Sequence, residues 1–258
     1  PAAGKVLVIH GYADHAARFE RVARFWNERG LAVGRFDLRG HGRSGGSRGH
    51  VMNVGEYVSD ARAVLAALAE QPEWKNAPGR PVLFGHSMGG LVASELAFVS
   101  RREIAGMAAT SPLFGMKRVI SGLELMGGKL ALRVLPKLRQ SAGLVGTDMT
   151  HDPNAAKSYD ADPYHFGHVT MGWVFAILES QSKTLERAEQ FDTPLFCIAA
   201  GDDRVVSNAA TERFFERAGS REKELDVSPG SFHELLNEPD WRHHASRLAE
   251  RMLRWSGV

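Results

Sequence analysis

The sequence predicts an α/β fold with a mostly parallel central sheet, helices on both faces of that sheet and a helical cap insertion. Two observations support this prediction. Short apolar runs that are typical of strands alternate with segments of helical periodicity from Lys5 to Thr110, and such alternation produces parallel strands covered by helices. The alternation stops at Leu113 and resumes at Pro194.

The first elements follow in order from these patterns. Lys5–Ile9 is expected to be a strand. The helix expected over Ala16–Arg29 ends at Gly30, a residue type that often terminates helices. A strand over Leu31–Phe36 then leads into a glycine-rich loop over residues 37–46.

The next helix carries apolar residues at helical spacing from Tyr57 to Leu68. A short strand over Val82–Phe84, a helix between Leu91 and Val99 and a strand over Ile104–Thr110 follow it. The remaining elements are a strand over Pro194–Ala200, a helix over Ala209–Ala218, a strand over Lys223–Val227 and a helix over Trp241–Trp255.

Residues 113–190 interrupt a core domain made of residues 1–112 and 191–258. The interrupting segment is too long for a plain loop. It is expected to consist of helices without strands, broken at Gly127–Gly128, Pro136, Pro153 and Pro163. Because parallel strands present their carboxyl ends at one edge of the sheet, we expect this segment to lie over that edge as a lid, or cap.

Composition excludes several classes of protein. Of the 258 residues, 43% are hydrophobic and 24% are charged, and the net charge of +2 comes from Lys and Arg scattered among Asp and Glu. That pattern does not suit nucleic-acid binding. The single cysteine, Cys197, lies in an apolar strand, which indicates a buried, inert thiol. No apolar run approaches the ~18 residues of a membrane span and no signal peptide is recognised. A cytoplasmic protein, or one peripheral at a membrane, is therefore expected, unless a targeting segment has been trimmed.

The most informative motif is Gly85-His86-Ser87-Met88-Gly89, a G-x-S-x-G sequence between an expected strand and an expected helix. In that context the motif forms a nucleophile elbow, a sharp turn that raises a serine hydroxyl above the edge of a parallel sheet. Gly85 and Gly89 leave room where the strand and the helix pass closely. The alternative is a glycine-rich turn whose serine has no catalytic role.

A serine nucleophile needs a general base and a group that orients the base. In this architecture the acid and the histidine follow the serine in that order, each in a loop after a strand. His233 follows Lys223–Val227 and is the expected base, and Asp202 and Asp203 both follow Pro194–Ala200. The residues alone do not separate the two aspartates, because one of them can instead cap the next helix.

Two backbone N–H groups are expected to form the oxyanion hole. Met88 follows the nucleophile, and Tyr12 lies in the loop after the first strand, behind Gly11, which permits close approach. Because both donors belong to the main chain, substituting the side chains of Tyr12 or Met88 is expected to reveal little.

No metal or cofactor is expected. His165 and His168 have half the spacing of a metal site, but no Cys or carboxylate completes a zinc pattern. The glycines over residues 40–49 lack the Lys and Ser or Thr of a phosphate-binding loop. Arg39 and His41 are interpreted as residues that brace this loop.

Further motifs flank these residues: His10-Gly11-Tyr12-Ala13-Asp14-His15, Asp37-Leu38-Arg39-Gly40-His41-Gly42-Arg43-Ser44, Asp203-Arg204-Val205-Val206 and His233-Glu234-Leu235-Leu236-Asn237-Glu238. Together with the elbow they resemble, over nearly the whole chain, the monoacylglycerol lipase and lysophospholipase branch of the α/β-hydrolases, also labelled serine aminopeptidase-like. The resemblance implies the α/β-hydrolase fold. It also favours Asp203 over Asp202, since Asp203 matches the family's triad acid.

The resemblance and the ordered triad predict a serine carboxylester hydrolase that cleaves a monoacylglycerol, a lysophospholipid or a similar acyl lipid through an acyl-enzyme. Aminopeptidase, thioesterase and acyltransferase are alternatives on the same triad, because pocket shape and water access select the acceptor. A non-catalytic binding protein of the same fold is a further alternative. Such a protein is expected to lose a triad residue or an elbow glycine, and none is missing here.

Met116 to Leu138 is expected to line an acyl channel and to present a partly exposed apolar patch that contacts membranes or lipid aggregates transiently. The alternative is an ordinary helix packed on the core. The apolar residues behind this expectation are Leu123, Leu125, Met126, Leu130, Leu132, Val134 and Leu135.

Overall fold

The computed structural model describes residues 2–118 and 121–257, and its central sheet has six strands. Every neighbouring pair is parallel, as the alternation of strands and helices predicted. The strand order is β2 (Leu31–Arg35), β1 (Gly4–Ile9), β3 (Val82–His86), β4 (Gly106–Thr110), β7 (Leu195–Ala200) and β8 (Lys223–Ser228).

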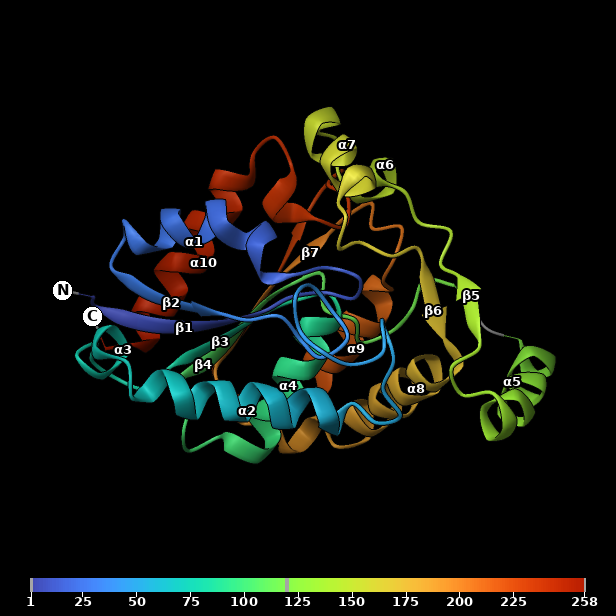
Figure 1. The fold of residues 1–258 in the computed structure, drawn as a ribbon. Coiled ribbons are helices and arrows are strands. Elements are labelled where there is room, and N and C mark those ends of the chain that lie inside the picture. The colour runs from blue at the N-terminus through green and yellow to red at the C-terminus, as the bar shows by residue number, and fades with distance from the viewer. Residues whose placement is uncertain (1, 119–120, 258) are drawn as a thin grey trace.

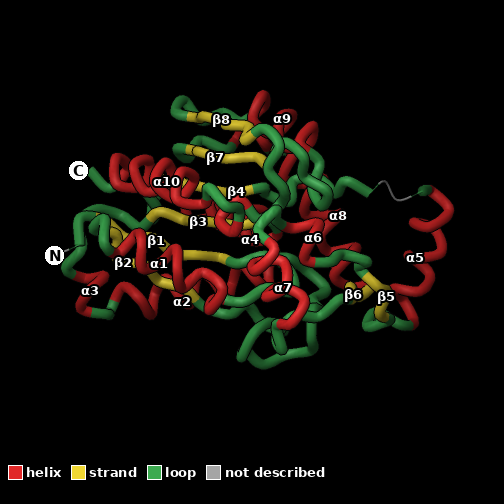
Figure 2. The backbone as a smooth tube through the Cα atoms, turned by 90° about the horizontal axis from the view of Figure 1, so that it is seen from above, coloured by secondary structure: helices red, strands yellow, loops and turns green. Residues whose placement is uncertain are grey.

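Helices cover both faces of this sheet (Figures 1 and 2). On one face lie α1 (Glu20–Asn27) and α10 (Trp241–Trp255). The other face carries α2 (Gly55–Ala69), α4 (Met88–Ser100), α8 (Met171–Glu186) and α9 (Asn208–Arg217). Shorter helical turns are α3 (Pro72–Lys75), η1 (Ala16–Phe19), η2 (Ala188–Gln190) and η3 (Leu235–Asn237).

Each face of the sheet buries its own core, because successive side chains of a strand point to opposite faces. In β3, Leu83 packs in the cluster that includes α2 and α4, whereas Phe84 packs with α1 and α10. The rings of Phe84 and Trp26 meet edge to face, with centroids 5.0 Å apart. Strands buried on both faces have continuous apolar sequences, which explains why the sequence located them within a few residues.

The chain reverses its direction of travel across the sheet between β1 and β3. From β1 it passes outward to β2, then returns to form β3 on the other side of β1. Loops at the carboxyl ends of such strands diverge and leave a crevice, which is where open α/β sheets bind ligands. Tyr12 follows β1 and Ser87 follows β3, so both expected contributors to the site stand at this crevice.

The expectation that residues 113–190 contain no strands is wrong. β5 (Arg139–Ser141) and β6 (His168–Thr170) form a two-stranded antiparallel sheet. Both strands are three residues long and largely polar, so they carry no periodicity that a sequence pattern could reveal. Figure 1 shows this pair beyond the carboxyl ends of the parallel strands. We keep the name cap for residues 113–190.

The expected break at Gly127–Gly128 is also wrong, because α5 (Gly122–Val134) runs through it. A Cβ atom at Gly128 would lie 2.9 Å from the ring of Phe175 in α8. The glycine therefore lets the two helices approach rather than ending one of them. The remaining cap helices are α6 (Gly146–Met149) and α7 (Pro153–Ala161), and α7 begins at one of the prolines expected to interrupt the segment.

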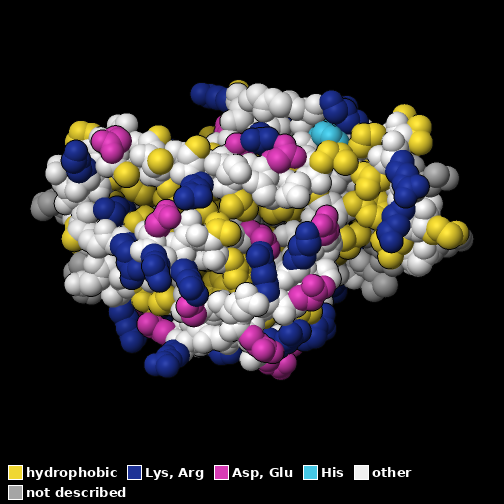
Figure 3. Space-filling view, turned by 90° about the horizontal axis from the view of Figure 1, so that it is seen from below, with side chains coloured by type: hydrophobic (Ala, Val, Ile, Leu, Met, Phe, Trp, Pro, Cys, Tyr) yellow, Lys and Arg dark blue, Asp and Glu magenta, His cyan; other side chains and the backbone are white. Residues whose placement is uncertain are grey.

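α5 exposes large apolar side chains to the surroundings. Met126 and Val134 of α5 are 67% and 71% exposed, and Leu135 and Leu138, which follow α5 in the chain, are also exposed. Figure 3 shows hydrophobic side chains gathered at the end of the molecule that carries α5, beside Lys and Arg side chains. The side chains of Leu123 and Leu130, and residues 119–120, lie outside the described part of the chain. Within the described ranges, no helix is long and apolar enough to cross a bilayer.

Candidate active site

Ser87 stands at the turn between β3 and α4, in a strained backbone conformation. Its φ of 54° and ψ of −120° lie outside the regions that L-residues favour. Three backbone hydrogen bonds hold it there: its N–H donates to the carbonyl of Thr110, and its carbonyl accepts from the N–H groups of Leu113 and Gly90. The surrounding structure therefore imposes a conformation that presents the hydroxyl above the sheet.

The elbow glycines are required by close backbone contacts. A Cβ atom at Gly85 would lie 2.4 Å from the carbonyl oxygen of Gly89. One at Gly89 would lie 2.0 Å from the carbonyl oxygen of Ile9 in β1. Neither position has room for a side chain, and a strand–turn–helix motif of this kind needs glycine at both positions for that reason.

The side chains of Ser87, His233 and Asp203 form a hydrogen-bonded chain. His233 Nε2 lies 2.9 Å from Ser87 Oγ, and His233 Nδ1 lies 2.8 Å from Asp203 Oδ2. All three residues are buried. Asp202, in contrast, is exposed, and its N–H donates to the carbonyl of Ser231. Between the two aspartates that the residues left open, the structure brings Asp203 to the histidine.

The carboxylate of Asp203 stays ionised in this buried position. Burial alone raises its pKa, but the charge of His233 and the hydrogen bonds from His233 and from the N–H groups of Val206 and Val205 outweigh burial and lower the pKa. An ionised carboxylate holds the Nδ1–H tautomer of the imidazole, which leaves Nε2 free to accept a proton from the serine.

Sequence reasoning missed two residues that fix this triad. Ser111 Oγ, at the end of β4, donates to the carbonyl of His233 at 2.9 Å. Lys117 Nζ donates to the carbonyl of Asp203 at 2.8 Å. The only signal available in the sequence was that Ser111 directly follows β4 and that Lys117 lies in the segment after it, at the carboxyl edge of the sheet.

A buried ion pair lies beside the histidine. Arg18 donates to both carboxylate oxygens of Glu234, at 2.8 and 2.7 Å, and to Asp14 at 3.2 Å. Burial raises the pKa of Glu234, but the charge and hydrogen bonds of Arg18 more than reverse this and lower the pKa to about 2. Since Glu234 follows His233 directly, the pair anchors the loop that carries the histidine.

His86, next to the nucleophile, is also close to His233, with ring centroids 4.9 Å apart. Burial, followed by the charge of His233, lowers the pKa of His86 to about 4. His86 is therefore neutral near pH 7, and a proton received by His233 meets no second positive charge there.

The two N–H groups expected to form the oxyanion hole belong to Tyr12, directly after Gly11, and to Met88, directly after Ser87. A Cβ atom on Gly11 would lie 3.3 Å from Ser87 Cβ, so the loop after β1 rests against the serine. Met88 opens α4, whose positive dipole end favours a developing negative charge. Within the described residues, neither N–H donates to another protein group.

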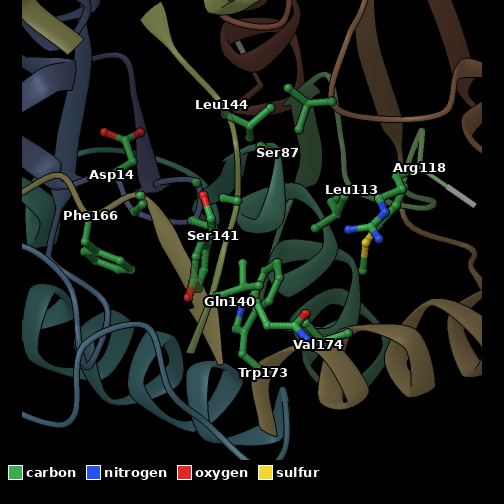
Figure 4. Close-up of a pocket in the computed structure, with 18 of the residues that line it drawn as sticks. Asp14, Ser87, Leu113, Arg118, Gln140, Ser141, Leu144, Phe166, Trp173 and Val174 are labelled. Atoms are coloured by element: carbon green, nitrogen blue, oxygen red, sulfur yellow. The ribbon is translucent and has the colours of Figure 1, made fainter. Parts of the chain in front are cut away.

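A cavity of about 530 Å³ opens above Ser87 (Figure 4). The charged side chains that line it are Asp14, Arg18, Arg118, Glu124, Arg204 and Glu234. Its apolar wall is formed largely by the cap, through Met116, Leu125, Leu138, Leu144, Met149, Val169, Trp173, Val174 and Phe175. The expectation that the segment from Met116 to Leu138 lines a channel near the serine agrees with this wall for Met116, Leu125 and Leu138.

His165 and His168 are not brought together with other ligands. His165 Nδ1 bonds the carbonyl of Ala13 at 3.1 Å, and the described residues contain no cluster of three metal-ligating side chains. Arg39 pairs with Glu56 and Asp60 at 2.6 Å in each case, which agrees with its interpretation as a brace.

Comparisons with known proteins identify the family to which the chain belongs. The family described as serine aminopeptidase, S33, matches residues 1–240. The chain is 30% identical over 239 residues to a monoacylglycerol lipase of Mycolicibacterium smegmatis, which covers 92% of this chain and 83% of that protein. It is 28% identical over 240 residues to phospholipase YtpA of Bacillus subtilis, covering 91% and 89%. The crystal structure of a monoacylglycerol lipase from Paleococcus ferrophilus superposes with a TM-score of 0.89 at 25% identity, covering 99% of this chain and 96% of that chain.

Proposed function

The chain belongs to the serine aminopeptidase, S33, family of α/β-hydrolases and is a lipase- or esterase-like serine hydrolase, and on this premise we propose that it hydrolyses a monoacylglycerol or a lysophospholipid. One observation carries the proposal: the hydroxyl of Ser87 is hydrogen-bonded to His233 and lies in a cavity whose wall is mainly apolar. Pockets of this kind bind an acyl chain by burying it, while a few polar groups orient the reacting end.

In the proposed reaction, Ser87 Oγ attacks the acyl carbonyl carbon while its proton passes to His233 Nε2. Asp203 accepts the hydrogen bond from Nδ1–H and stabilises the resulting imidazolium. The N–H groups of Tyr12 and Met88 donate to the oxyanion. His233 then returns the proton to the leaving alcohol oxygen, which leaves the acyl group on Ser87. Water, activated by His233, releases the fatty acid and restores the serine.

The charges in the cavity support an ester over a peptide with a free amino end. Asp14, Glu124 and Glu234 are the carboxylates that line the cavity in the described part of the chain. Each is paired with an arginine, Asp14 and Glu234 with Arg18, and Glu124 with Arg118. An aminopeptidase must bind a substrate ammonium group, and an unpaired carboxylate is the usual partner for that charge.

A panel of p-nitrophenyl esters from acetate to palmitate, run beside peptide and thioester substrates, tests the proposal. We expect hydrolysis of the esters, and covalent labelling of Ser87 by a fluorophosphonate. Ser87→Ala should lose several orders of magnitude in kcat, because only substrate binding and the oxyanion hole remain. Wild-type activity in Ser87→Ala, or preferred cleavage of peptides or thioesters, would contradict the proposal.

We also propose that the exposed apolar side chains of α5 and the residues after it contact lipid aggregates. Lys129, Arg133 and Lys137 are exposed among these apolar residues. An apolar face with cations beside it suits reversible attachment to an anionic lipid surface. Because the same segment contributes to the cavity wall, lipid taken up at the surface would have a short path to Ser87, and cap movement would admit it.

A further inference from the structure

Trp173, the third residue of α8, contacts the side chains of both residues that supply the proposed oxyanion hole. Its indole N–H donates to Met88 Sδ at 3.2 Å. Its ring lies against the ring of Tyr12, with centroids 3.9 Å apart and planes inclined by 37°. Trp173 is 6% exposed and Met88 is fully buried, so both contacts lie in the interior. Figure 4 shows Trp173 and Val174 at one side of the cavity that contains Ser87.

The far end of the Tyr12 ring is held as well. The Tyr12 hydroxyl donates to the carbonyl of Gly49 at 2.9 Å and lies 3.1 Å from the carbonyl of His168 in β6. Gly49 has a φ of +60°, and a Cβ atom there would lie 2.1 Å from the Tyr12 hydroxyl oxygen. The glycine therefore makes room for the ring, which is clamped between α8, β6 and the glycine-rich loop.

The amino end of α8 is attached at the same point. Thr170 caps the helix by accepting from the N–H of Trp173 at 3.3 Å, and its hydroxyl donates to the carbonyl of Gly49 at 3.2 Å. The carbonyl of Gly49 thus joins the end of Tyr12 to the first turn of α8. These hydrogen bonds, through the Gly49 carbonyl and Thr170, fix the position of Trp173 relative to Tyr12.

We propose that Trp173 is a positioning residue that sets the two N–H groups of the oxyanion hole relative to each other. The inference rests on the proposed function. Tyr12 and Met88 lie after different strands. An oxyanion hole nevertheless needs both N–H donors at roughly 2.7–3.1 Å from the oxygen on which the negative charge develops. A misplacement of about 1 Å costs on the order of 10²-fold in rate. One rigid side chain that packs on both residues limits such misplacement.

Trp173 belongs to α8, which packs on the central sheet and directly follows β6, so the same contacts join the proposed oxyanion hole to the carboxyl end of the cap. α8 also packs against α4. A displacement of α8 would therefore move Tyr12 and Met88 away from their positions beside Ser87. The side chains of Tyr12 and Met88 would therefore help to position the backbone N–H groups of the same two residues.

Two substitutions separate the contacts. Trp173→Phe retains a ring against Tyr12 and removes the hydrogen bond to Met88, and Trp173→Leu removes both. We expect kcat on p-nitrophenyl butyrate to fall about threefold for Trp173→Phe, consistent with one modest hydrogen bond. Trp173→Leu should fall about tenfold or more, but less than the 10²–10³-fold that loss of an oxyanion donor costs. KM should change little in both.

An alkyl trifluoromethyl ketone reports on the hole itself. Ser87 Oγ adds to its carbonyl carbon, the serine proton passes to His233, and the carbonyl oxygen becomes an oxyanion in the hole. Its inhibition constant should rise by the factor by which kcat/KM falls, because it resembles the transition state. The corresponding secondary alcohol forms no oxyanion, and its inhibition constant should not change.

Val174→Ala is the matched control, since Val174 lines the same cavity from the same helix; it should alter KM rather than kcat. Combining Trp173→Phe with Met88→Leu should cost no more than either alone, because both remove one hydrogen bond. Comparing the melting temperatures of wild type and Trp173→Phe establishes whether Trp173→Phe folds normally. That variant then tests the proposal even if Trp173→Leu does not fold.

The outcomes separate the two proposals. The rate at which a fluorophosphonate labels Ser87 needs no knowledge of the substrate, and it should fall with kcat in the Trp173 variants. An effect on KM alone, additive effects with Met88→Leu, or unchanged labelling and ketone inhibition would overturn the positioning role. Failure of wild type to cleave any ester, with labelling still slowed by Trp173→Phe, would refute the proposed function and leave the positioning role standing.

Discussion

Single residues in this site hold conformations and charges that only their surroundings make stable. Ser87 adopts a φ of 54°, which costs an L-residue on the order of 1–3 kcal/mol. The hydrogen bonds to Thr110 and Leu113 offset that cost and keep the hydroxyl presented. Asp203 is buried and still ionised, because His233 and two backbone N–H groups bond its carboxylate.

The two neighbouring aspartates allow a matched test at this scale. Asp203→Asn should lower kcat by about 10⁴-fold, because an amide favours the wrong tautomer of the histidine. Asp202→Asn removes one charge from an exposed position and should retain the wild-type kcat. Steady-state kinetics on a soluble p-nitrophenyl ester measure both. A wild-type kcat in Asp203→Asn would show that Asp203 is not the acid.

Among the elements, α5 and α8 differ in how they meet the rest of the molecule. α8 buries Trp173, Ala176 and Ile177 in the main core, whereas α5 leaves Met126 and Val134 largely exposed. Burying an apolar side chain of this size is worth roughly 1.5–3 kcal/mol. By the proposed lipid contact, α5 would gain from a lipid surface the kind of burial that α8 has in the core.

This contrast predicts a substrate-dependent effect. Val134→Ser on α5 and Val99→Ser on α4 make the same change at helical positions that are 71% and 59% exposed. Val134→Ser should lower activity on emulsified monoacylglycerol while sparing a short soluble ester. Val99→Ser should leave both activities unchanged.

Equal losses on the two substrates for Val134→Ser would indicate an ordinary structural role for α5. The same conclusion would follow if the activity on emulsions did not change. Flotation of the two variants with anionic vesicles measures lipid contact directly.

At the scale of the whole molecule, the cap and the core meet around the ion pair of Arg18 and Glu234. Arg18 lies at the end of η1, between β1 and β2, and Glu234 lies after β8, at the opposite edge of the sheet order. The guanidinium of Arg18 also lies over the ring of Tyr159 in α7, 5.1 Å from its centroid. The guanidinium of Arg18 therefore contacts Asp14 near the start of the chain, Glu234 near its end and Tyr159 in the cap.

This pair makes stability depend on acidity. The pKa of Glu234 falls from its usual 4.5 to about 2 in the folded chain, so the unfolded chain binds a proton that the folded chain does not. The free energy of unfolding should therefore decrease as the pH falls from about 5 to about 2. Glu234→Gln should flatten that decrease and cost about 3 kcal/mol at pH 7, because Arg18 loses the carboxylate that it binds through two hydrogen bonds and keeps only Asp14 as a charged partner.

Urea unfolding of wild type and Glu234→Gln from pH 2.5 to pH 7 measures this difference. Glu212→Gln, at an exposed position of α9, is the control and should retain the wild-type profile. If Glu234→Gln followed the wild-type profile too, the ion pair would not be the origin of the acid sensitivity.

Local pattern and chain order were enough to predict the parallel sheet, the turn that carries Ser87 and the loop that carries His233. Strands buried on both faces are apolar throughout, and the elbow needs glycines at set spacings, so both can be recognised from neighbouring residues. The same patterns located α10 over Trp241–Trp255 with the bounds that the structure has.

Only the tertiary structure decided what depends on distance between remote residues. By physical reasoning alone, Asp202 and Asp203 were equivalent, and their separation from His233 distinguishes them. The three-residue strands β5 and β6 exist because each pairs with the other, and neither has a periodicity of its own. Trp173 likewise meets Tyr12 and Met88 through packing between elements. Such contacts have no local signature, because their free energy arises when the chain brings distant side chains together.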